Sequence, residues 1–256
     1  MPRFAANLTF LFNELPFVER FAAARTAGFD AVEFISPYGL SVGQLGQLVE
    51  ENQLAISVFN LPAGDWEAGE RGLAALPGRE AEFQASVGLA LQYAQASGAT
   101  QLHMMAGITA GMDHALVRQT YLANLRYAAE RLAEAGLTLL IEPINTRDMP
   151  GYFLAQTDQA VQVIEEVALP NLKLQFDIYH HQISRGDVSR YLERLMPVIG
   201  HIQIASIPAR QEPDTGELDY RHVFRLLDEL GYTGWVGCEY RPRVGTVAGL
   251  GWLIPY

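Results

Sequence analysis

Residues 137–145 read LTLLIEPIN, an apolar run that a single carboxylate, Glu142, interrupts near its end. A strand that is apolar on both faces is typical of a parallel sheet with helices on either side. Similar short runs recur along the chain, each apolar throughout or rich in β-branched and aromatic residues. They cover residues 4–12, 31–36, 54–61, 101–107, 172–180, 198–206 and 234–240. The sequence therefore predicts eight strands.

Longer segments with an apolar residue every three or four positions separate these runs and predict helices. The clearest are 16–27, 78–97, 114–135 and 158–168. Several end on a glycine just before the next strand, as helices with a left-handed C-terminal residue do; these glycines are Gly28, Gly98, Gly136 and Gly231. Strict alternation of strand and helix in about 250 residues predicts one α/β domain over residues 1–256, a (β/α)8 TIM barrel.

A doubly wound open sheet is the alternative architecture. No GxGxxG follows the first strand and no linker divides the chain, so the barrel is favoured. The segment 62–79, PAGDWEAGERGLAALPGR, follows the third strand with four glycines and no helical period. In a barrel it would lie on the face where active sites are found. We expect it to serve as an active-site lid, with an ordinary solvated loop as the alternative.

Composition excludes several classes of function. The chain has 18 Lys+Arg against 29 Asp+Glu, a net charge of -11, which disfavours nucleic acid and anionic membranes as partners. The single cysteine, Cys238, rules out an intrachain disulfide and a cysteine zinc cluster, and is typical of the cytoplasm. No segment approaches the roughly 20 apolar residues of a membrane helix. The serine-hydrolase, P-loop and zincin motifs are also missing.

Four polar residues interrupt the last four predicted strands near their C-terminal ends: Glu142, Asp177, Gln203 and Glu239. Successive members are 35, 26 and 36 residues apart, and each separation fits one βα unit. Buried carboxylates are costly unless they share a counter-charge, and a divalent cation would supply it. Three carboxylates with an amide oxygen suit Mg²⁺ or Mn²⁺ better than Zn²⁺. For each residue alone, a salt bridge at the barrel rim is the alternative.

Histidines and arginines near the strand ends are candidates for binding a substrate. His180, at the exit of the sixth strand, and His103, within the fourth, are predicted to contact it; a buried, hydrogen-bonded histidine is the alternative for His103. His181 and His201 are expected to point elsewhere. Asn7, Glu33, Phe59 and Asn60 could line the opposite wall or belong to the core.

A substrate carboxylate would need an arginine, because guanidinium matches carboxylate geometry. Four arginines follow strands: Arg71, Arg79, Arg210 and Arg241. The sequence does not choose among them, and each could equally be a surface residue. Arg79 and Arg210 are the predicted contacts.

Motifs along the whole chain add a family resemblance. They are MPRFAANLT, AGFDAVEF, LPGRE, the MAG that follows His103, IEPINTRDMPGYFL, FDIYH, the HIQIAS segment with its following P, R, EP and GE, CEYRP and GLGW. With these motifs the chain resembles the hydroxypyruvate isomerase family of xylose-isomerase-like TIM barrels. The resemblance implies reversible conversion of hydroxypyruvate to 2-hydroxy-3-oxopropanoate (tartronate semialdehyde). Glu142 and Glu239 match the family's acid/base pair, and Asp177 and Gln203 its remaining metal ligands.

The resemblance leaves the substrate open. A close subgroup acts on 2-oxo-tetronates and shares the start of the chain, CEY and GLGW, whereas residues 143–152 look more like the hydroxypyruvate branch. Related sugar 3-epimerases usually have histidine where this chain has Gln203. A metal-dependent endonuclease of the same barrel group and a non-catalytic metabolite-binding barrel are more remote alternatives. The resemblance also implies a homo-oligomer and a role in glyoxylate and carbohydrate metabolism.

Overall fold

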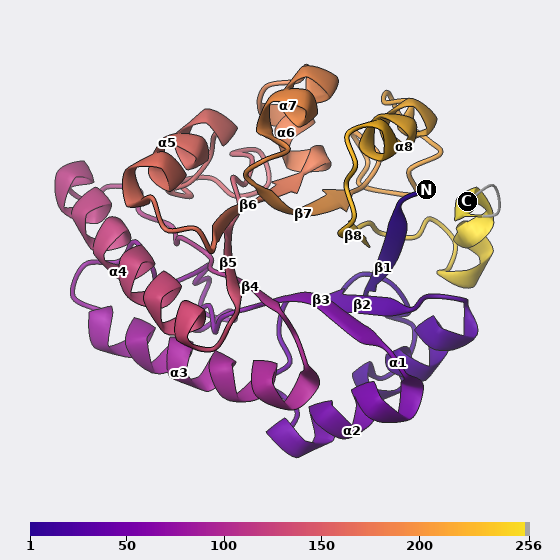
Figure 1. Cartoon of the computed structure of the whole chain (residues 1–256), viewed down its shortest axis with the longest axis horizontal. Coiled ribbons are helices and arrows are strands. Elements are labelled where there is room, and N and C mark those ends of the chain that lie inside the picture. Colours follow the sequence, from indigo (N-terminus) through magenta and orange to yellow (C-terminus); the bar gives the residue numbers. More distant parts are fainter. Residues whose placement is uncertain (254–256) are drawn as a thin grey trace.

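Eight parallel strands hydrogen-bond in chain order, and β8 pairs with β1, so the sheet closes into a barrel (Figure 1). The computed structural model describes residues 1–253. The strands are β1 (Arg3–Asn7), β2 (Ala31–Phe34), β3 (Ala55–Asn60), β4 (Gln101–His103), β5 (Thr138–Ile141), β6 (Leu172–Asp177), β7 (Ile199–Ile204) and β8 (Trp235–Cys238). The predicted TIM barrel and its eight strands are confirmed.

The strands are shorter than the apolar runs that predicted them, and β6 shows why. The run 172–180 continues past the strand, but Asp177 Oδ1 accepts a hydrogen bond from the Tyr179 N–H at 2.8 Å and so caps a helix. That helix is α6 (Ile178–Ser184). The strand predicted to reach residue 180 therefore ends at Asp177, and His180, at the exit of β6 as predicted, lies in the first turn of this helix.

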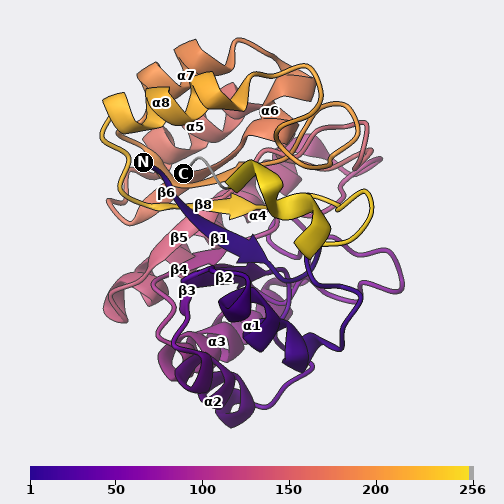
Figure 2. The ribbon, with the colours of Figure 1, turned by 90° about the vertical axis from the view of Figure 1, so that its right-hand side faces the viewer.

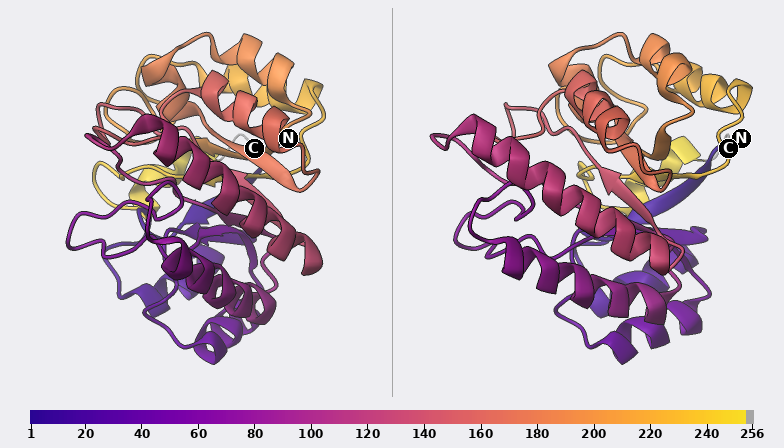
Figure 3. Two further views of the ribbon diagram at one scale, coloured as in Figure 1. Left: turned by 90° about the vertical axis from the view of Figure 1, so that its left-hand side faces the viewer. Right: turned by 60° about the vertical axis from the view of Figure 1, so that its left-hand side comes forward.

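Helices form a ring outside the barrel (Figure 1). They are α1 (Phe17–Thr26), α2 (Val42–Asn52), α3 (Glu80–Ser97), α4 (His114–Glu134), α5 (Thr157–Val167), α7 (Val188–Leu195) and α8 (Tyr220–Glu229), besides α6. The long helices α3 and α4 run side by side (Figure 3). The four glycines predicted to follow helices have φ between 69° and 95°, as expected for left-handed C-terminal residues. None of the helices in residues 1–253 has the length and apolar character to span a membrane.

A short 3-10 helix, η1 (Val247–Leu253), follows β8 and lies against the barrel beside β1 (Figure 2). Trp252 is its anchor. The indole packs edge-on against Phe4 of β1, with ring centroids 5.1 Å apart, and its N–H donates to the Tyr240 hydroxyl at 3.0 Å. Burial of such an aromatic ring with its polar atom paired fixes the segment that follows the last strand.

Alternation along each strand sorts apolar from polar side chains. Leu102, Ile141, Leu174, Ile202 and Cys238 are fully or almost fully buried in the apolar core. Their neighbours one position away point into the barrel. Towards the C-terminal ends of the strands these inner positions are polar. The fold thus places a buried polar cluster at the end of the barrel where the βα loops begin.

Candidate active site

Three of the four predicted strand-end residues, Glu142, Gln203 and Glu239, line one cavity of about 420 Å³. Asp177 is buried beside it, and its Oδ2 lies 3.5 Å from His180 and 3.6 Å from Arg210, which both line the cavity. Asp177 and Gln203 belong to β6 and β7, whereas Glu142 and Glu239 follow directly after β5 and β8. Gln203 Nε2 donates to Glu239 Oε2 at 2.6 Å. Gln175 Nε2 donates to Glu142 Oε2 at 3.1 Å and to Gln203 Oε1 at 2.7 Å. The predicted convergence of these side chains is therefore present in the structure.

Burial dominates the electrostatics of this cluster. It raises the pKa of Glu142 well above its ordinary value, with the charges of Asp177 and Glu239 adding to the effect. Burial also raises the pKa of Glu239 to about 8 and that of Asp177 to about 6, although Arg210 opposes both shifts. Without a further positive charge, these carboxyls hold protons that exposed carboxyls would release.

Arg210 is the cation that this cluster already has. Its guanidinium Nη2 donates to Glu239 Oε1 and lies 3.6 Å from Asp177 Oδ2, and Nη1 lies 3.9 Å from Asp148. The loop after β7 holds Arg210 in a left-handed conformation with φ of 53°. One guanidinium thus faces two buried carboxyl groups, Glu239 and Asp177, and the more exposed Asp148. With Glu142 nearby, the cluster has more carboxyl groups than cations.

The donor set fits a divalent cation. Glu142 Oε1 and Asp177 Oδ2 are buried and have no hydrogen-bond partner in the structure. Ligand atoms of Glu142, Asp177 and His180 lie within 4.8 Å of one another. Two carboxyl oxygens without hydrogen-bond partners, in a cluster with more carboxyl groups than cations, suit a hard cation such as Mg²⁺ or Mn²⁺. The amide oxygen of Gln203 already accepts from Gln175, so as a metal ligand it would share its second lone pair.

His180 faces the same oxygens, and its tautomer follows from its neighbours. Asn145 Oδ1 accepts from the Asp148 N–H, which leaves Asn145 Nδ2 to donate to His180 Nδ1 at 2.6 Å. Nε2 must then carry the proton, and it points at Asp177 Oδ2, 3.5 Å away. Burial lowers the pKa of His180 well below its ordinary value. The ring is thus a neutral donor, suited to a substrate oxygen.

His103 lines the opposite side of the cavity. Its Nδ1 lies 3.0 Å from Asn60 Oδ1, whereas its Nε2 is buried, has no hydrogen-bond partner and lies 3.7 Å from Glu142 Oε2. Burial lowers the pKa of His103 to about 3. The ring is therefore uncharged at neutral pH and presents an unprotonated nitrogen, which can accept a hydrogen bond from a hydroxyl.

Glu33, named from the sequence only as a residue that could line the opposite wall, is also the centre of a hydrogen-bonded layer that was not predicted. Glu33 Oε1 accepts from Asn7 at 2.9 Å and from Gln203 at 2.8 Å, and Oε2 accepts from Ser57 at 3.1 Å and His201 at 2.7 Å. His201 does not line the cavity, as expected, but it lies two positions before Gln203 on the same face of β7 and bonds to Glu33 inside the barrel. Period-two spacing within the strand was the signal that could have found it.

Asn7 joins this layer to the cavity. Its Nδ2 also donates to Glu239 Oε2 at 3.0 Å, so one amide holds carboxylates on two strands. Asn7, Glu33 and Asn60 line the cavity, whereas Phe59 packs against Phe34 in the core. His181 is held by Thr157 and the Gly186 carbonyl and does not line the cavity.

The arginines fall into two groups. Arg71, Arg210 and Arg241 line the cavity. Arg79 does not; it forms ion pairs with Glu70 and, at 2.7 Å, with Glu82, and so closes the base of the segment 62–79. That position is unsuitable for the substrate contact predicted for Arg79.

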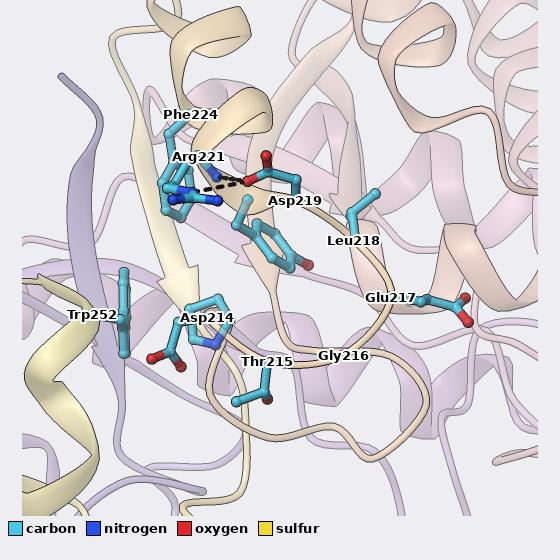
Figure 4. A pocket seen from close by; sticks show the side chains of 11 residues that line it. Asp214, Thr215, Gly216, Glu217, Leu218, Asp219, Arg221, Phe224 and Trp252 are labelled. Atoms are coloured by element: carbon cyan, nitrogen blue, oxygen red, sulfur yellow. Dashed lines mark hydrogen bonds and ion pairs between the residues drawn. The ribbon is translucent and has the colours of Figure 1, made fainter.

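A larger hollow of about 620 Å³ lies outside the barrel, between residues 213–219, the start of α8 and Trp252 (Figure 4). Asp219 in its wall caps α8 and pairs with Arg221, and Asp214 and Glu217 lie on the surrounding loop (Figure 4). None of the carboxylates within the barrel lines this hollow. The cavity at the strand ends is therefore the candidate active site.

Sequence and structure comparisons agree with this architecture. The sequence model of the xylose isomerase-like TIM barrel family matches residues 21–256. A 2-oxo-tetronate isomerase from Cupriavidus necator is 56% identical over 100% of this chain and 99% of its own. The hydroxypyruvate isomerase of Escherichia coli is 46% identical, with both chains covered completely.

Among solved structures, one described as an AP endonuclease, family 2, from Brucella melitensis matches with a TM-score of 0.98 and 50% identity. It covers 100% of this chain and 99% of its own. A 3-keto-D-glucoside 4-epimerase from E. coli matches with a TM-score of 0.81 at 20% identity, over the full length of both chains, and shows a shared fold.

Proposed function

The chain belongs to the xylose isomerase-like TIM barrel family, and we propose that it is an aldose–ketose isomerase acting on a short hydroxy-carbonyl acid. The observation that carries this proposal is the pairing of Glu142 and Glu239 in one cavity. The reaction exchanges a carbonyl and a hydroxyl on adjacent carbons, so a proton leaves one carbon and another arrives at its neighbour. Two carboxyl groups that differ in protonation state suffice for both transfers.

The surroundings of the two glutamates support different tasks. Glu239 accepts from Asn7, Gln203 and Arg210, which hold its carboxylate in place. Glu142 accepts from Gln175 at one oxygen and leaves Oε1 without a partner. In the proposed reaction one glutamate removes the proton from the hydroxyl-bearing carbon, and the other returns a proton to the former carbonyl carbon. The hydroxyl proton passes to the former carbonyl oxygen, so that the carbonyl and the hydroxyl exchange places. The two exchange roles in the reverse direction.

The remaining polar groups would orient the substrate. His180 Nε2 donates to a substrate oxygen, and His103 Nε2 accepts from a hydroxyl, so the two rings distinguish the carbonyl from its neighbouring alcohol. The residues that would hold a divalent cation are Glu142, Asp177, Gln203 and Glu239. When bound, such a cation polarises the carbonyl and so acidifies the adjacent C–H.

Two substrates are candidates, and different observations favour each. Hydroxypyruvate is favoured by residues 143–152, which resemble the hydroxypyruvate branch of the family, and by the 46% identical hydroxypyruvate isomerase. A 2-oxo-tetronate is favoured by the 56% identical relative, and a cavity of about 420 Å³ has room for the fourth carbon. The net charge of -11 disfavours DNA as a substrate. The proposed setting is the cytoplasm and glyoxylate metabolism.

A coupled assay tests the proposal directly. Purified protein is incubated with hydroxypyruvate or a 2-oxo-tetronate, before and after chelation, and the isomeric product is measured. We expect turnover that chelation abolishes and Mg²⁺ or Mn²⁺ restores. Absence of turnover on both acids would refute the proposed function, and cleavage of abasic DNA in the same preparation would replace it.

Reaction in D₂O tests the proton-transfer route. Deuterium from solvent should enter the product, because a carboxyl group that removes a proton can exchange it. Product without any deuterium would instead indicate a hydride shift between the two carbons.

A further inference from the structure

We propose that Arg71 is the residue that binds the substrate carboxylate, an assignment that rests on the proposed function. Arg71 lies in the segment 62–79 and lines the cavity at the strand ends. The sequence offered four arginines for this role and favoured Arg79 and Arg210. The contacts of the four side chains decide between them.

The guanidinium of Arg71 is held in place by uncharged groups. It stacks on the Trp66 ring, with Cζ 3.9 Å from the ring centroid. Its Nη1 donates to the carbonyl oxygens of Trp66 at 3.0 Å and Glu70 at 2.7 Å. Stacking and two main-chain acceptors restrict the side chain before any ligand arrives, and this lowers the entropy lost on binding.

The positive charge of Arg71 is not neutralised. No carboxylate in residues 1–253 forms an ion pair with it, and every contact it makes is one of those just described. The edge formed by Nε and Nη2 therefore has no partner within that part of the chain. This edge can donate two parallel hydrogen bonds, which is the geometry that a carboxylate accepts.

The other three arginines are less suited. Arg210 is already engaged by Glu239, Asp177 and Asp148, and Arg79 by Glu70 and Glu82. Arg241 also lines the cavity, but its side chain is exposed and forms no ion pair with residues 1–253. Of the two unpaired cations at the cavity, only Arg71 is held in a fixed orientation. A substrate lying between Arg71 and the two glutamates would have its carboxylate at the segment 62–79 and its reacting carbons at the strand ends of the barrel.

The test compares Arg71→Gln with Arg241→Gln, which removes the same charge from the same cavity. Hydroxypyruvate and a 2-oxo-tetronate serve as anionic probes, and dihydroxyacetone serves as an uncharged analogue of hydroxypyruvate. We expect Arg71→Gln to raise KM for the acids roughly 10- to 100-fold, the range for hydrogen bonds between charged groups, with kcat changed less than about threefold. Activity on dihydroxyacetone should change less than about threefold. Arg241→Gln should raise KM for the acids less than Arg71→Gln does. Arg126→Gln, an exposed change on α4 outside the cavity, should leave every parameter within about threefold of wild type.

Binding gives a readout that does not depend on turnover. Because Arg71 stacks on Trp66, binding of a carboxylate there should change the fluorescence of that indole. Titration with hydroxypyruvate should give a Kd that rises in Arg71→Gln by the same factor as KM. Arg71→Lys retains the charge without the two parallel donors and should lie between wild type and Arg71→Gln.

The outcomes separate this assignment from the proposed function. Turnover by wild type with unchanged KM in Arg71→Gln overturns the assignment alone. Tight binding of hydroxypyruvate that requires Arg71, without turnover of either acid, overturns the proposed function alone. Arg71→Gln could instead lower activity on the acids and on dihydroxyacetone by the same factor, without recovery of the preference for acids in Arg71→Lys. In that case Arg71 only supports the segment 62–79, and the assignment is wrong.

Discussion

The two halves of the barrel contribute different chemistry to one cavity. The strands β5 to β8 carry or lead into Glu142, Gln203 and Glu239, which line the cavity, and Asp177, which is buried beside it. The strands β1 to β4 supply Asn7, Glu33, Ser57, Asn60 and His103, most of which bond to other side chains. Side chains from β1 to β4 thus hold in place the reactive groups that β5 to β8 provide. Catalytic geometry in this fold depends on a supporting layer as much as on the reacting groups.

Removing a reactive carboxylate should have the largest effect. Glu142→Gln and Glu239→Gln are each expected to lower kcat/KM about 100-fold or more, because general acid–base groups contribute about that factor. Both variants should remain folded, as measured by circular dichroism. Glu165→Gln, an exposed change of the same kind on α5, is the matched control. Near-normal turnover in either active-site variant contradicts its assigned role.

Breaking the supporting layer tests whether the first half is needed. Glu33→Gln replaces two acceptor oxygens, which four donors share, with an amide that must turn its NH₂ towards some of them. We expect the free energy of unfolding to fall by about 1–3 kcal/mol and kcat/KM by roughly tenfold. Denaturant unfolding and steady-state kinetics measure both. A stable variant with wild-type activity would mean that the layer does not position the site.

A pH titration of the chelated protein sharpens the contrast in charge. The pKa of Glu239 is raised from 4.5 to about 8 in the folded protein, so the folded state binds more protons than the unfolded state between these values. The stabilisation is complete below about 4.5 and is lost as the pH rises through about 8. Tm without metal should therefore fall from pH 5 to about 8, and the increase caused by Mn²⁺ should grow over the same range.

Glu239→Gln supplies the control for that titration. The amide does not ionise, so the fall in Tm with pH should be smaller in this variant. A slope equal to that of wild type would assign the effect to other groups.

The smallest effect is expected at His103. His103→Gln keeps a hydrogen-bonding side chain but moves the acceptor that faces Glu142, and kcat/KM should fall roughly threefold to tenfold. Because the pKa of His103 is lowered to about 3, this residue should add no inflection to the pH–rate profile near neutrality. An inflection near pH 6.5 that vanishes in His103→Gln would show that the histidine ionises there.

The strand-end groups could be predicted because each is a polar residue inside an apolar run, and burial makes such residues conspicuous. His201 and Glu33 are equally buried. Period-two spacing could have placed His201 on the inner face of β7, but its pairing with Glu33 is a contact across the barrel between β2 and β7 that no local pattern reports. The early end of β6 was missed for another reason. Asp177 caps α6, which is a local signal, but the apolar run 172–180 continues past it and predicted a longer strand.

Arginines in loops were harder to predict. Arg71 and Arg79 both lie in the segment 62–79 and have similar neighbours in the sequence. Only the path of the backbone in that segment decides which of the two reaches the cavity. The segment has no helical or strand period, so its sequence carries no signal about direction. Tertiary structure alone separates an arginine that lines the cavity from one that fastens the loop.

Closure of β8 on β1, with Asn7 holding Glu239 across 232 residues, also governs when the site comes into being. During synthesis on the ribosome β1 emerges long before β8. Asn7 of β1 can therefore bond Glu239 only after β8 has emerged. A translation product that ends before β8 therefore lacks Glu239 and the β1–β8 pairing that completes the site.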